Sequence, residues 1–217
     1  MKIAVLGTGM VGESIGSKLV SLGHQVMMGS RIAGNEKAKN WVTTAGSNAS
    51  SGSFSDAAKF GELVFNCTKG EHSVEVLKQA GITNLKNKIV VDISNPLDLS
   101  KGMPPTLSIC NDNSLAEEIQ KALPESNVVK TLNTLAAPIM VNPGIVNGGN
   151  HHIFLSGNNA EAKGQVKEIL QSFGWKSDHI IDLGDISTAR GTEQLLPIWI
   201  RLMGVFNSPM FQFQIVK

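Results

Sequence analysis

The sequence predicts an α/β fold, with a doubly wound, mainly parallel sheet followed by a small C-terminal helical appendage. Short apolar runs alternate with segments of helical spacing up to residue 184. A glycine-rich turn follows the first run, and after residue 184 the apolar residues collect on one helical face. Strands that alternate with helices form parallel sheets with right-handed crossovers. We therefore expect one domain over residues 1–184 and a helical segment over residues 185–217.

The composition is that of a compact globular protein with no excess of either charge. Of the 217 residues, 41% are hydrophobic and 17% are charged, and 19 Lys and Arg balance 18 Asp and Glu. Proteins that bind nucleic acids gain affinity by neutralising many phosphates, and a net charge of +1 leaves no surplus for that purpose. We therefore expect no nucleic-acid partner.

Features of secreted and membrane proteins are also missing. The apolar run 3–6 is too short for the core of a signal peptide. The run 195–206 is interrupted by Arg201 and falls short of the ~20 residues that span a bilayer. The two cysteines, Cys67 and Cys110, lack metal-type spacing and are typical of reduced thiols. Together these observations predict a cytoplasmic protein with no membrane association.

The N-terminal residues predict a strand, a turn, a helix and a second strand. The first strand is Lys2–Leu6, after which apolar residues recur at helical spacing at positions 11, 15, 19 and 22. Gly23 ends the helix, and Gln25–Met28 forms the next strand.

The same alternation continues along the chain. Buried strands are expected at 63–67, 89–93, 128–132, 152–155 and 180–183, and helices from residue 55, from residue 114 and over 160–173. Ser114 and Glu117 form a capping box, which marks the start of one helix. Loops are expected at 46–53, around a short edge strand, and at 143–150. The last segment carries Leu195, Leu196, Ile198, Trp199, Leu202 and Met203 on one broad helical face.

A GxGxxG motif lies between the first strand and helix and consists of Gly7, Thr8, Gly9, Met10, Val11 and Gly12. In a Rossmann βαβ unit, the first glycine permits a tight turn and the second lets the backbone approach a pyrophosphate. The third lets helix and strand pack closely. The phosphates lie on free N–H groups at the helix N-terminus. Because the motif follows a strand and opens a helix, we interpret it as a dinucleotide-binding loop.

The end of the second strand predicts which dinucleotide binds. An NAD site has Asp or Glu there to accept the ribose 2′-OH, whereas this chain has Ser30 and Arg31. Both side chains can donate to a 2′-phosphate, and Lys37 could add a second positive charge. We therefore expect NADP(H) as the cofactor.

The carboxyl ends of the later strands supply the remaining candidates, because ligands of open parallel sheets bind along that edge. These candidates are Thr68, Lys69, His72, Asn95, Pro96, Asn133 and Ala136. We interpret His72 as a cofactor contact or a surface residue in preference to a proton donor, because a helix is expected to begin there. No catalytic acid or base is expected. His151 and His152 point to opposite faces of a strand, so no metal site is expected.

Several motifs taken together carry a family resemblance. They are residues 7–12, Gly29-Ser30-Arg31, Thr68 with Glu71-His72, and residues 183–190. In combination they resemble the NADPH-dependent F420 reductases (F420H2:NADP oxidoreductases). A second set is equally similar to the cytosolic reductase domain of the six-transmembrane metalloreductases: Ser94-Asn95, Val129-Lys130, residues 154–158 and Leu196-Pro197. The resemblance covers nearly the whole chain and implies hydride transfer between NADPH and a flavin or deazaflavin ring.

The resemblance also implies roles for individual residues. Residues 7–12 would bind the pyrophosphate, and Ser30 with Arg31 would hold the 2′-phosphate. Thr68, His72, Asn95 and residues 133–136 would border the nicotinamide and the acceptor ring. The chain has Lys69-Gly70 where the F420 enzymes carry an apolar residue, Pro and Trp, which leaves the acceptor open among F420, FMN, FAD and ferric chelates. A flavin or F420 would then be a second ring, and the enzyme could support ferric reduction.

The sequence leaves two alternative functions open and also predicts an oligomeric state. A dehydrogenase of a small hydroxy acid or imine typically carries a long helical domain with a catalytic Lys, but no Lys lies between Lys176 and Lys217. A non-catalytic dinucleotide-binding sensor is the third possibility. The apolar residues Leu195, Ile198, Trp199, Leu202 and Phe206 predict a symmetric homodimer, in agreement with the resemblance.

Overall fold

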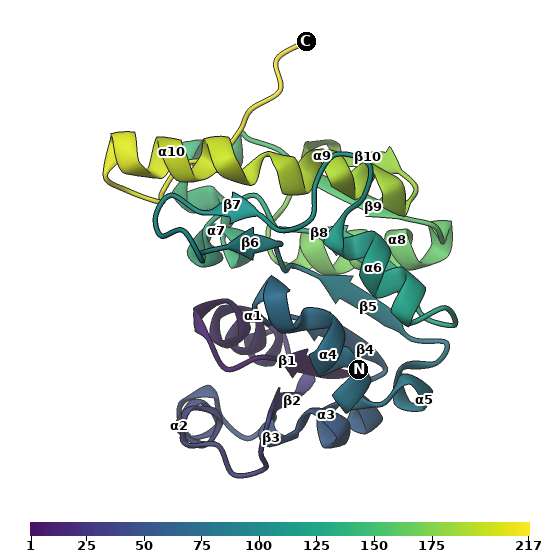
Figure 1. The fold of residues 1–217 in the computed structure, drawn as a ribbon. Helices are drawn as coiled ribbons and strands as arrows, with labels where there is room; N and C mark the ends of the chain where they lie inside the picture. The colour runs from purple at the N-terminus through teal and green to yellow at the C-terminus, as the bar shows by residue number, and fades with distance from the viewer.

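The computed structural model describes residues 1–217 and contains an eight-stranded sheet between two layers of helices (Figure 1). The strands are β1 (Lys2–Leu6), β2 (Gln25–Ser30), β3 (Ala49–Ser53), β4 (Leu63–Asn66), β5 (Ile89–Asp92), β8 (Asn127–Thr131), β9 (Ile153–Gly157) and β10 (Ile180–Gly184). Their order in the sheet is β10-β9-β8-β5-β4-β1-β2-β3. The doubly wound, mainly parallel sheet of the Rossmann type is therefore confirmed.

The last two strands run opposite to the rest of the sheet. β9 pairs antiparallel with β8, and β10 pairs parallel with β9. The chain leaves β8 at the carboxyl edge and passes through α7 (Ala137–Val141) and two short 3-10 turns. It then re-enters the sheet from that same edge, with no crossover helix to return it to the other edge. Alternation of apolar runs along the sequence does not reveal such a reversal.

Helices cover both faces of the sheet. They are α1 (Met10–Ser21), α2 (Glu36–Ala45), α3 (Phe54–Phe60), α4 (Gly70–Ala80), α5 (Ile82–Leu85), α6 (Leu115–Ala122), α8 (Ala160–Ser172), α9 (Ala189–Gln194) and α10 (Leu196–Phe206). Alternate strand residues point into two separate cores, because side chains along a strand alternate between its faces. Ile3 and Val5 belong to a core of 28 residues beneath α1, α2 and α8, whereas Ala4 and Leu6 belong to a core of 18 residues beneath α3, α4 and α6.

Helix starts follow the predicted capping chemistry with one shift. Ser114 caps α6 by accepting from the Glu117 backbone N–H over 3.2 Å, as predicted, but the capping box is incomplete because the Ser114 N–H donates to Asn113 Oδ1 and not to Glu117. Helix α3 begins one residue earlier than predicted, at Phe54, because Ser53 and Asp56 form its capping box. Ser53 is also the last residue of the edge strand β3, which explains why the sequence places the helix start slightly late.

The C-terminal segment forms two consecutive helices that lie along one end of the sheet. Helix α10 follows α9 after Leu195, and Pro197 lies in its first turn, where a missing N–H costs nothing. Figure 1 shows α10 crossing above a small hairpin, β6 (Leu97–Asp98) with β7 (Thr106–Leu107), and the last residues running away from the body. The hairpin follows β5 and is too short to leave a periodic signal in the sequence. None of the helices has the length and apolar character needed to cross a membrane.

Candidate functional site

The glycines of the turn after β1 are required for two different reasons. Gly7 has φ of +118°, and a Cβ on it would lie 2.7 Å from the Cys67 carbonyl oxygen. A Cβ on Gly12 would lie 2.1 Å from the Gly7 carbonyl oxygen, so α1 can press against the turn only if residue 12 is glycine. By contrast, a Cβ on Gly9 would meet no atom within 4 Å. The protein itself needs Gly7 and Gly12, whereas Gly9 faces the open space that a phosphate would occupy.

The N-terminus of α1 opens onto that space. Gly9 is the N-cap residue, and no side chain caps the helix. The N–H groups of the first turn therefore have no acceptor within the helix, and they carry the positive end of its dipole. Such a helix end binds anions without further groups. The backbone after β1 therefore leaves room and N–H groups for a pyrophosphate, and the role of residues 7–12 stays a prediction.

A cleft of about 450 Å³ lies where the chain topology divides the sheet between β1 and β4. It brings together the predicted residues Gly7, Thr8, Gly9, Ser30, Arg31, Lys37, Thr68, Lys69 and His72, with Asn35, Phe54, Cys67 and Val76 beside them. Met10 and Val11 lie outside this lining, Met10 exposed and Val11 packed against the larger core. Dinucleotides bind at such a switch point in doubly wound sheets.

Two unpaired cations lie at the β2 end of the cleft. Arg31 and Lys37 are exposed and form none of the salt bridges of the chain. Ser30 is buried, and its hydroxyl donates to the Ile32 carbonyl oxygen over 2.6 Å. Ser30 thus shapes the loop that presents Arg31. Asn35, which the sequence reasoning missed, caps α2 by accepting from the Ala38 N–H over 3.2 Å.

The tip of β4 forms another wall of the cleft. The Thr68 hydroxyl donates to Asn66 Oδ1 over 2.7 Å and lies 2.9 Å from Ser73 Oγ, so its orientation is fixed. His72 lies in the first turn of α4, as predicted, and its side chain is 54% exposed and 3.4 Å from Glu71. An exposed His of this kind suits a cofactor contact. Burial, together with the nearby negative charge of Asp92, raises the pKa of the Cys67 thiol above its usual range.

The remaining predicted residues lie along the same edge but behind the cleft. Asn95 Nδ2 donates to the Asn133 carbonyl oxygen, and Asn133 Nδ2 donates to Asn95 Oδ1, both over 2.9 Å. Pro96 is buried, and Ala136 is the half-buried N-cap residue of α7. None of these four lines the cleft. A nicotinamide ring that reached Asn95 would have to extend past Thr68 toward the tip of β5.

The sequence reasoning missed a group of buried ionisable residues at this edge. Asp92 and Lys130 end or nearly end β5 and β8, and Glu193 comes from α9. All three are at most 1% exposed, and Lys130 Nζ contacts the two carboxylates over 2.7 and 2.8 Å. A charged residue near the end of an apolar strand was the available signal, but the partners lie far apart in the sequence.

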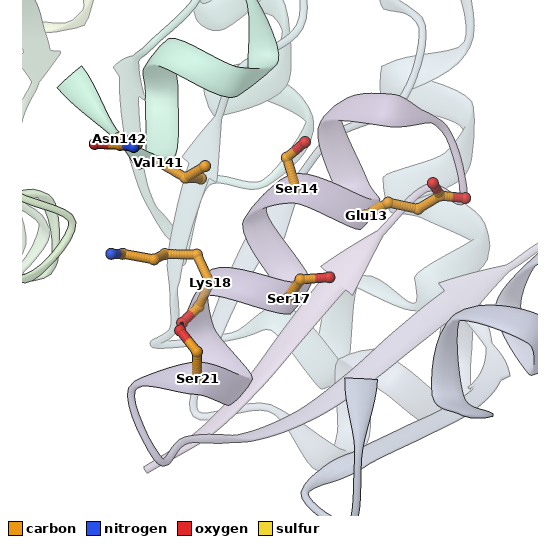
Figure 2. Close-up of a pocket in the computed structure, with 7 residues that line it drawn as sticks. All are labelled: Glu13, Ser14, Ser17, Lys18, Ser21, Val141 and Asn142. Atoms are coloured by element: carbon orange, nitrogen blue, oxygen red, sulfur yellow. Dashed lines mark hydrogen bonds between the residues drawn. The ribbon is translucent and has the colours of Figure 1, made fainter. Parts of the chain in front are cut away.

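A larger hollow of about 670 Å³ lies on the outer flank of α1 and is shown in Figure 2. It is lined by Glu13, Ser14, Ser17, Lys18 and Ser21 of α1 and by Val141 and Asn142 at the end of α7. These side chains spread apart and do not converge on a common point in Figure 2. The hollow also lies away from the glycine turn, so the cleft at the switch point remains the candidate site.

The histidines after the 3-10 turns serve the structure. His151 Nε2 lies 3.0 Å from the Pro143 carbonyl oxygen, and its ring packs edge-on against Trp175 with centroids 5.1 Å apart. Burial lowers the pKa of His151 and of His152. No group of three His, Cys, Asp or Glu side chains is arranged to hold a metal ion.

Known proteins match this chain over part or all of its length. The sequence model of a family described as NADP oxidoreductase, coenzyme F420-dependent, matches residues 2–96. The crystal structure of a protein from Arthrobacter sp. FB24, regarded as an F420-dependent NADP-reductase, is 48% identical, with a TM-score of 0.94 and complete coverage of both chains. A Streptomyces aurantiacus imine reductase is 17% identical and covers 95% of this chain and 64% of its own, with a TM-score of 0.66, which shows a shared fold.

A curated relative comes from the metalloreductases. Metalloreductase STEAP3 of Rattus norvegicus is 29% identical over 206 residues, which cover 91% of this chain. The match covers only 38% of the rat protein, so this chain spans about two fifths of its length. From the whole-length match to the Arthrobacter protein and the family match over the glycine turn, the chain is an NADP-dependent oxidoreductase and belongs to the family of coenzyme F420-dependent NADP oxidoreductases.

Proposed function

We propose that this protein transfers hydride between NADP(H) and the ring of a flavin or of the deazaflavin F420. The observation that carries the cofactor half of the proposal is the cleft itself. It joins the open face of Gly9 at one wall to the unpaired cations Arg31 and Lys37 at another. The acceptor half is supported by the Arthrobacter relative, which is similar over its whole length.

Different residues of the cleft would bind different parts of the cofactor. Gly7–Gly9 and the N-terminus of α1 would receive the pyrophosphate, and Arg31 with Lys37 would neutralise the 2′-phosphate. Thr68 and His72 would direct the nicotinamide end of the cofactor toward the tip of β5, where Asn95 lies. Bound NADPH supplies the hydride, so no side chain has to exchange a proton with the reacting carbon.

The protein's contribution to the reaction is then orientation. Holding two rings in contact converts an encounter in solution into a step within one complex, which accounts for several kcal/mol of many enzymatic accelerations, up to about 7–11 kcal/mol. The fixed hydroxyl of Thr68 and the paired amides of Asn95 and Asn133 are suited to such a task, because their own contacts hold them still. Ferric reduction by electrons from the reduced ring is part of the proposal and is supported by the similarity to metalloreductases.

One assay tests the proposed function. NADPH oxidation is followed at a fixed protein concentration with F420, FMN, FAD and a ferric chelate supplied separately. We expect turnover with at least one ring compound, and turnover with the ferric chelate only when that ring compound is also present. Tight NADPH binding without turnover by any of the four would reject the proposal in favour of a dinucleotide sensor.

A further inference from the structure

A row of polar side chains crosses three neighbouring strands behind the cleft. Asn66, Asp92 and Lys130 are paired in register on β4, β5 and β8, and all three are buried. Asn66 Nδ2 donates to Asp92 Oδ1 over 2.8 Å, and Lys130 Nζ donates to Asp92 Oδ2 over 2.7 Å. Burying such groups in an apolar sheet is costly unless each one finds its partner. Here each of them does.

Lys130 stands at the β8 end of the row and has the most contacts. Its ammonium group also contacts Glu193 Oε1 over 2.8 Å and donates to the Ser94 carbonyl oxygen, so three acceptors match its three N–H bonds. Burial alone would lower the pKa of Lys130, but the two carboxylates outweigh it and raise the pKa above its usual value. The lysine is therefore charged and held in place from three sides.

Glu193 connects the row to the C-terminal helices. Its Oε2 accepts from the Leu115 N–H over 2.8 Å, and its Oε1 accepts from the Ala116 N–H over 3.1 Å, so the α9 side chain caps the first turn of α6. The positive end of the α6 dipole also compensates the second carboxylate, which Lys130 alone does not neutralise. Strands β4, β5 and β8 are thus tied to α6 and α9 by one set of contacts.

The other end of the row reaches the cleft wall. Asn66 Oδ1 accepts from the Thr68 hydroxyl over 2.7 Å, and Asp92 Oδ1 accepts from the Ser94 hydroxyl, also over 2.7 Å. The tips that carry Thr68 and Asn95 therefore both depend on Asp92, which Lys130 holds. The phosphate end of the cleft does not depend on this row, because none of these hydrogen bonds involves residues 7–12 or Arg31.

We propose that Lys130 and Glu193 are positioning residues for hydride transfer, a role that rests on the function proposed above. By fixing the spacing of the β4 and β5 tips, they set the place where the nicotinamide faces its acceptor, and they fasten α9 beside that place. They have no part in holding the phosphates. A misplacement of about 1 Å can lower a rate about a hundredfold, so the loss of this spacing should reduce kcat far more than affinity.

The test compares Lys130→Met with Lys163→Met. Lys163 also forms an ion pair, 2.8 Å from Asp182, but this pair is partly exposed and lies at the far edge of the sheet on α8 and β10. We expect Lys130→Met to lower kcat by about tenfold to a hundredfold with little change in the NADPH dissociation constant. The emission of bound NADPH, which reports the surroundings of the nicotinamide, should also shift. Lys163→Met should leave kcat, affinity and emission near their wild-type values.

Two outcomes would overturn the positioning role. One is a folded Lys130→Met protein with wild-type kcat and wild-type NADPH emission. The other is a loss of activity in both variants in the same proportion as their fall in Tm, which would show a purely structural effect. If the wild-type protein turns over no acceptor, the proposed function fails, and the emission comparison still decides whether Lys130 positions the ring.

A second variant covers the case in which Lys130→Met does not fold. Glu193→Gln keeps the size of the side chain and leaves Lys130 paired with Asp92. The amide has one acceptor oxygen in place of two, so the Leu115 and Ala116 N–H groups and Lys130 can no longer all be satisfied. We expect a smaller loss of kcat in the same direction, again with NADPH affinity retained. Unchanged kcat and emission in this variant would refute the proposal.

Discussion

At the scale of single residues, Gly9 separates ligand binding from folding. A valine side chain there would meet no protein atom near its Cβ but would project into the expected path of the pyrophosphate. We expect Gly9→Val to abolish binding of both NADPH and NADH while circular dichroism and Tm stay near wild type. Gly12→Ala is the contrasting variant, because its Cβ would lie 2.1 Å from the Gly7 carbonyl oxygen and would destabilise the fold. Retained NADPH binding by Gly9→Val in calorimetry would contradict the placement of the loop.

We propose that Arg31 sets the preference for a phosphorylated ribose. A charge-assisted hydrogen bond is worth about 1.5–3 kcal/mol, which corresponds to roughly tenfold to a hundredfold in affinity. Arg31→Ala should therefore weaken NADPH by about that factor and leave NADH nearly unchanged in calorimetric titrations. Arg201→Ala, an exposed arginine on α10, serves as the control. Equal losses for both dinucleotides would show that Arg31 acts on something other than the 2′-phosphate.

Site residues that belong to a local motif could be predicted from the sequence. Contacts between residues that lie far apart in the sequence could not. The glycines of residues 7–12 follow a strand and open a helix, so their local context was enough. Ser30 was predicted as a phosphate donor, yet its hydroxyl donates to the Ile32 carbonyl oxygen, a contact that depends on the path of the loop. Glu193 lies more than one hundred positions from Asp92 in the sequence, and only the packing of α9 against α6 brings them together.

At the scale of elements, a bidentate salt bridge between Arg190 and Glu117 joins α9 to α6. Arg190 Nε and Nη2 donate to the two carboxylate oxygens of Glu117 over 2.9 and 2.6 Å. The hydrogen bond from Arg190, with help from Ser114, holds the pKa of Glu117 below its usual value. A carboxyl group whose pKa is lowered by folding stabilises the native state above its ordinary pKa, and this contribution is lost as the pH falls through the lower folded value.

Removal of this salt bridge should therefore lower the stability of the fold at neutral pH, and the loss should become smaller at acid pH. Arg190→Ala is expected to lower the urea midpoint of unfolding at pH 7. The difference from wild type should shrink as Glu117 takes up a proton below its ordinary pKa of about 4.3. Arg201→Ala removes an exposed arginine that forms none of the salt bridges, so it should show no such pH dependence. A difference for Arg190→Ala that stayed constant from neutral to acid pH would contradict the assigned role of Glu117.

Helices and strands with a clear apolar period could be predicted from the sequence. The direction of a strand within the sheet and the presence of very short strands could not. The amphipathic helix predicted over 160–173 corresponds to α8 within one residue. The reversal of β9 and β10 escaped prediction because a strand has the same alternation in either direction. The hairpin β6–β7 consists of two-residue strands, which cover only a single period of strand alternation and so show no repeat. The predicted boundary between residues 184 and 185 stays a prediction.

At the scale of the whole molecule, α10 and the residues after it expose a large apolar surface. Ile198, Val205, Phe206 and Met210 are between 42% and 77% exposed, and Trp199 stacks on Phe211 with centroids 5.3 Å apart. Several exposed apolar side chains on one short segment typically mark a contact with another protein. We propose that it is the contact of a symmetric homodimer in which α10 closes the acceptor end of the cleft on its own or the neighbouring chain.

Val205→Asp tests this assembly with the least risk to the fold, because the valine is 77% exposed in the single chain. In a dimer the new carboxylate would be buried against apolar groups without a partner, which strongly disfavours association. We expect light scattering to find the wild-type protein as a dimer and Val205→Asp as a monomer with nearly normal NADPH affinity but lower turnover of the ring acceptor. Gln171→Asp, on the exposed side of α8, adds the same charge elsewhere and should remain dimeric. A wild-type protein that is monomeric at micromolar concentration would remove the dimer, and α10 would then cover only its own chain.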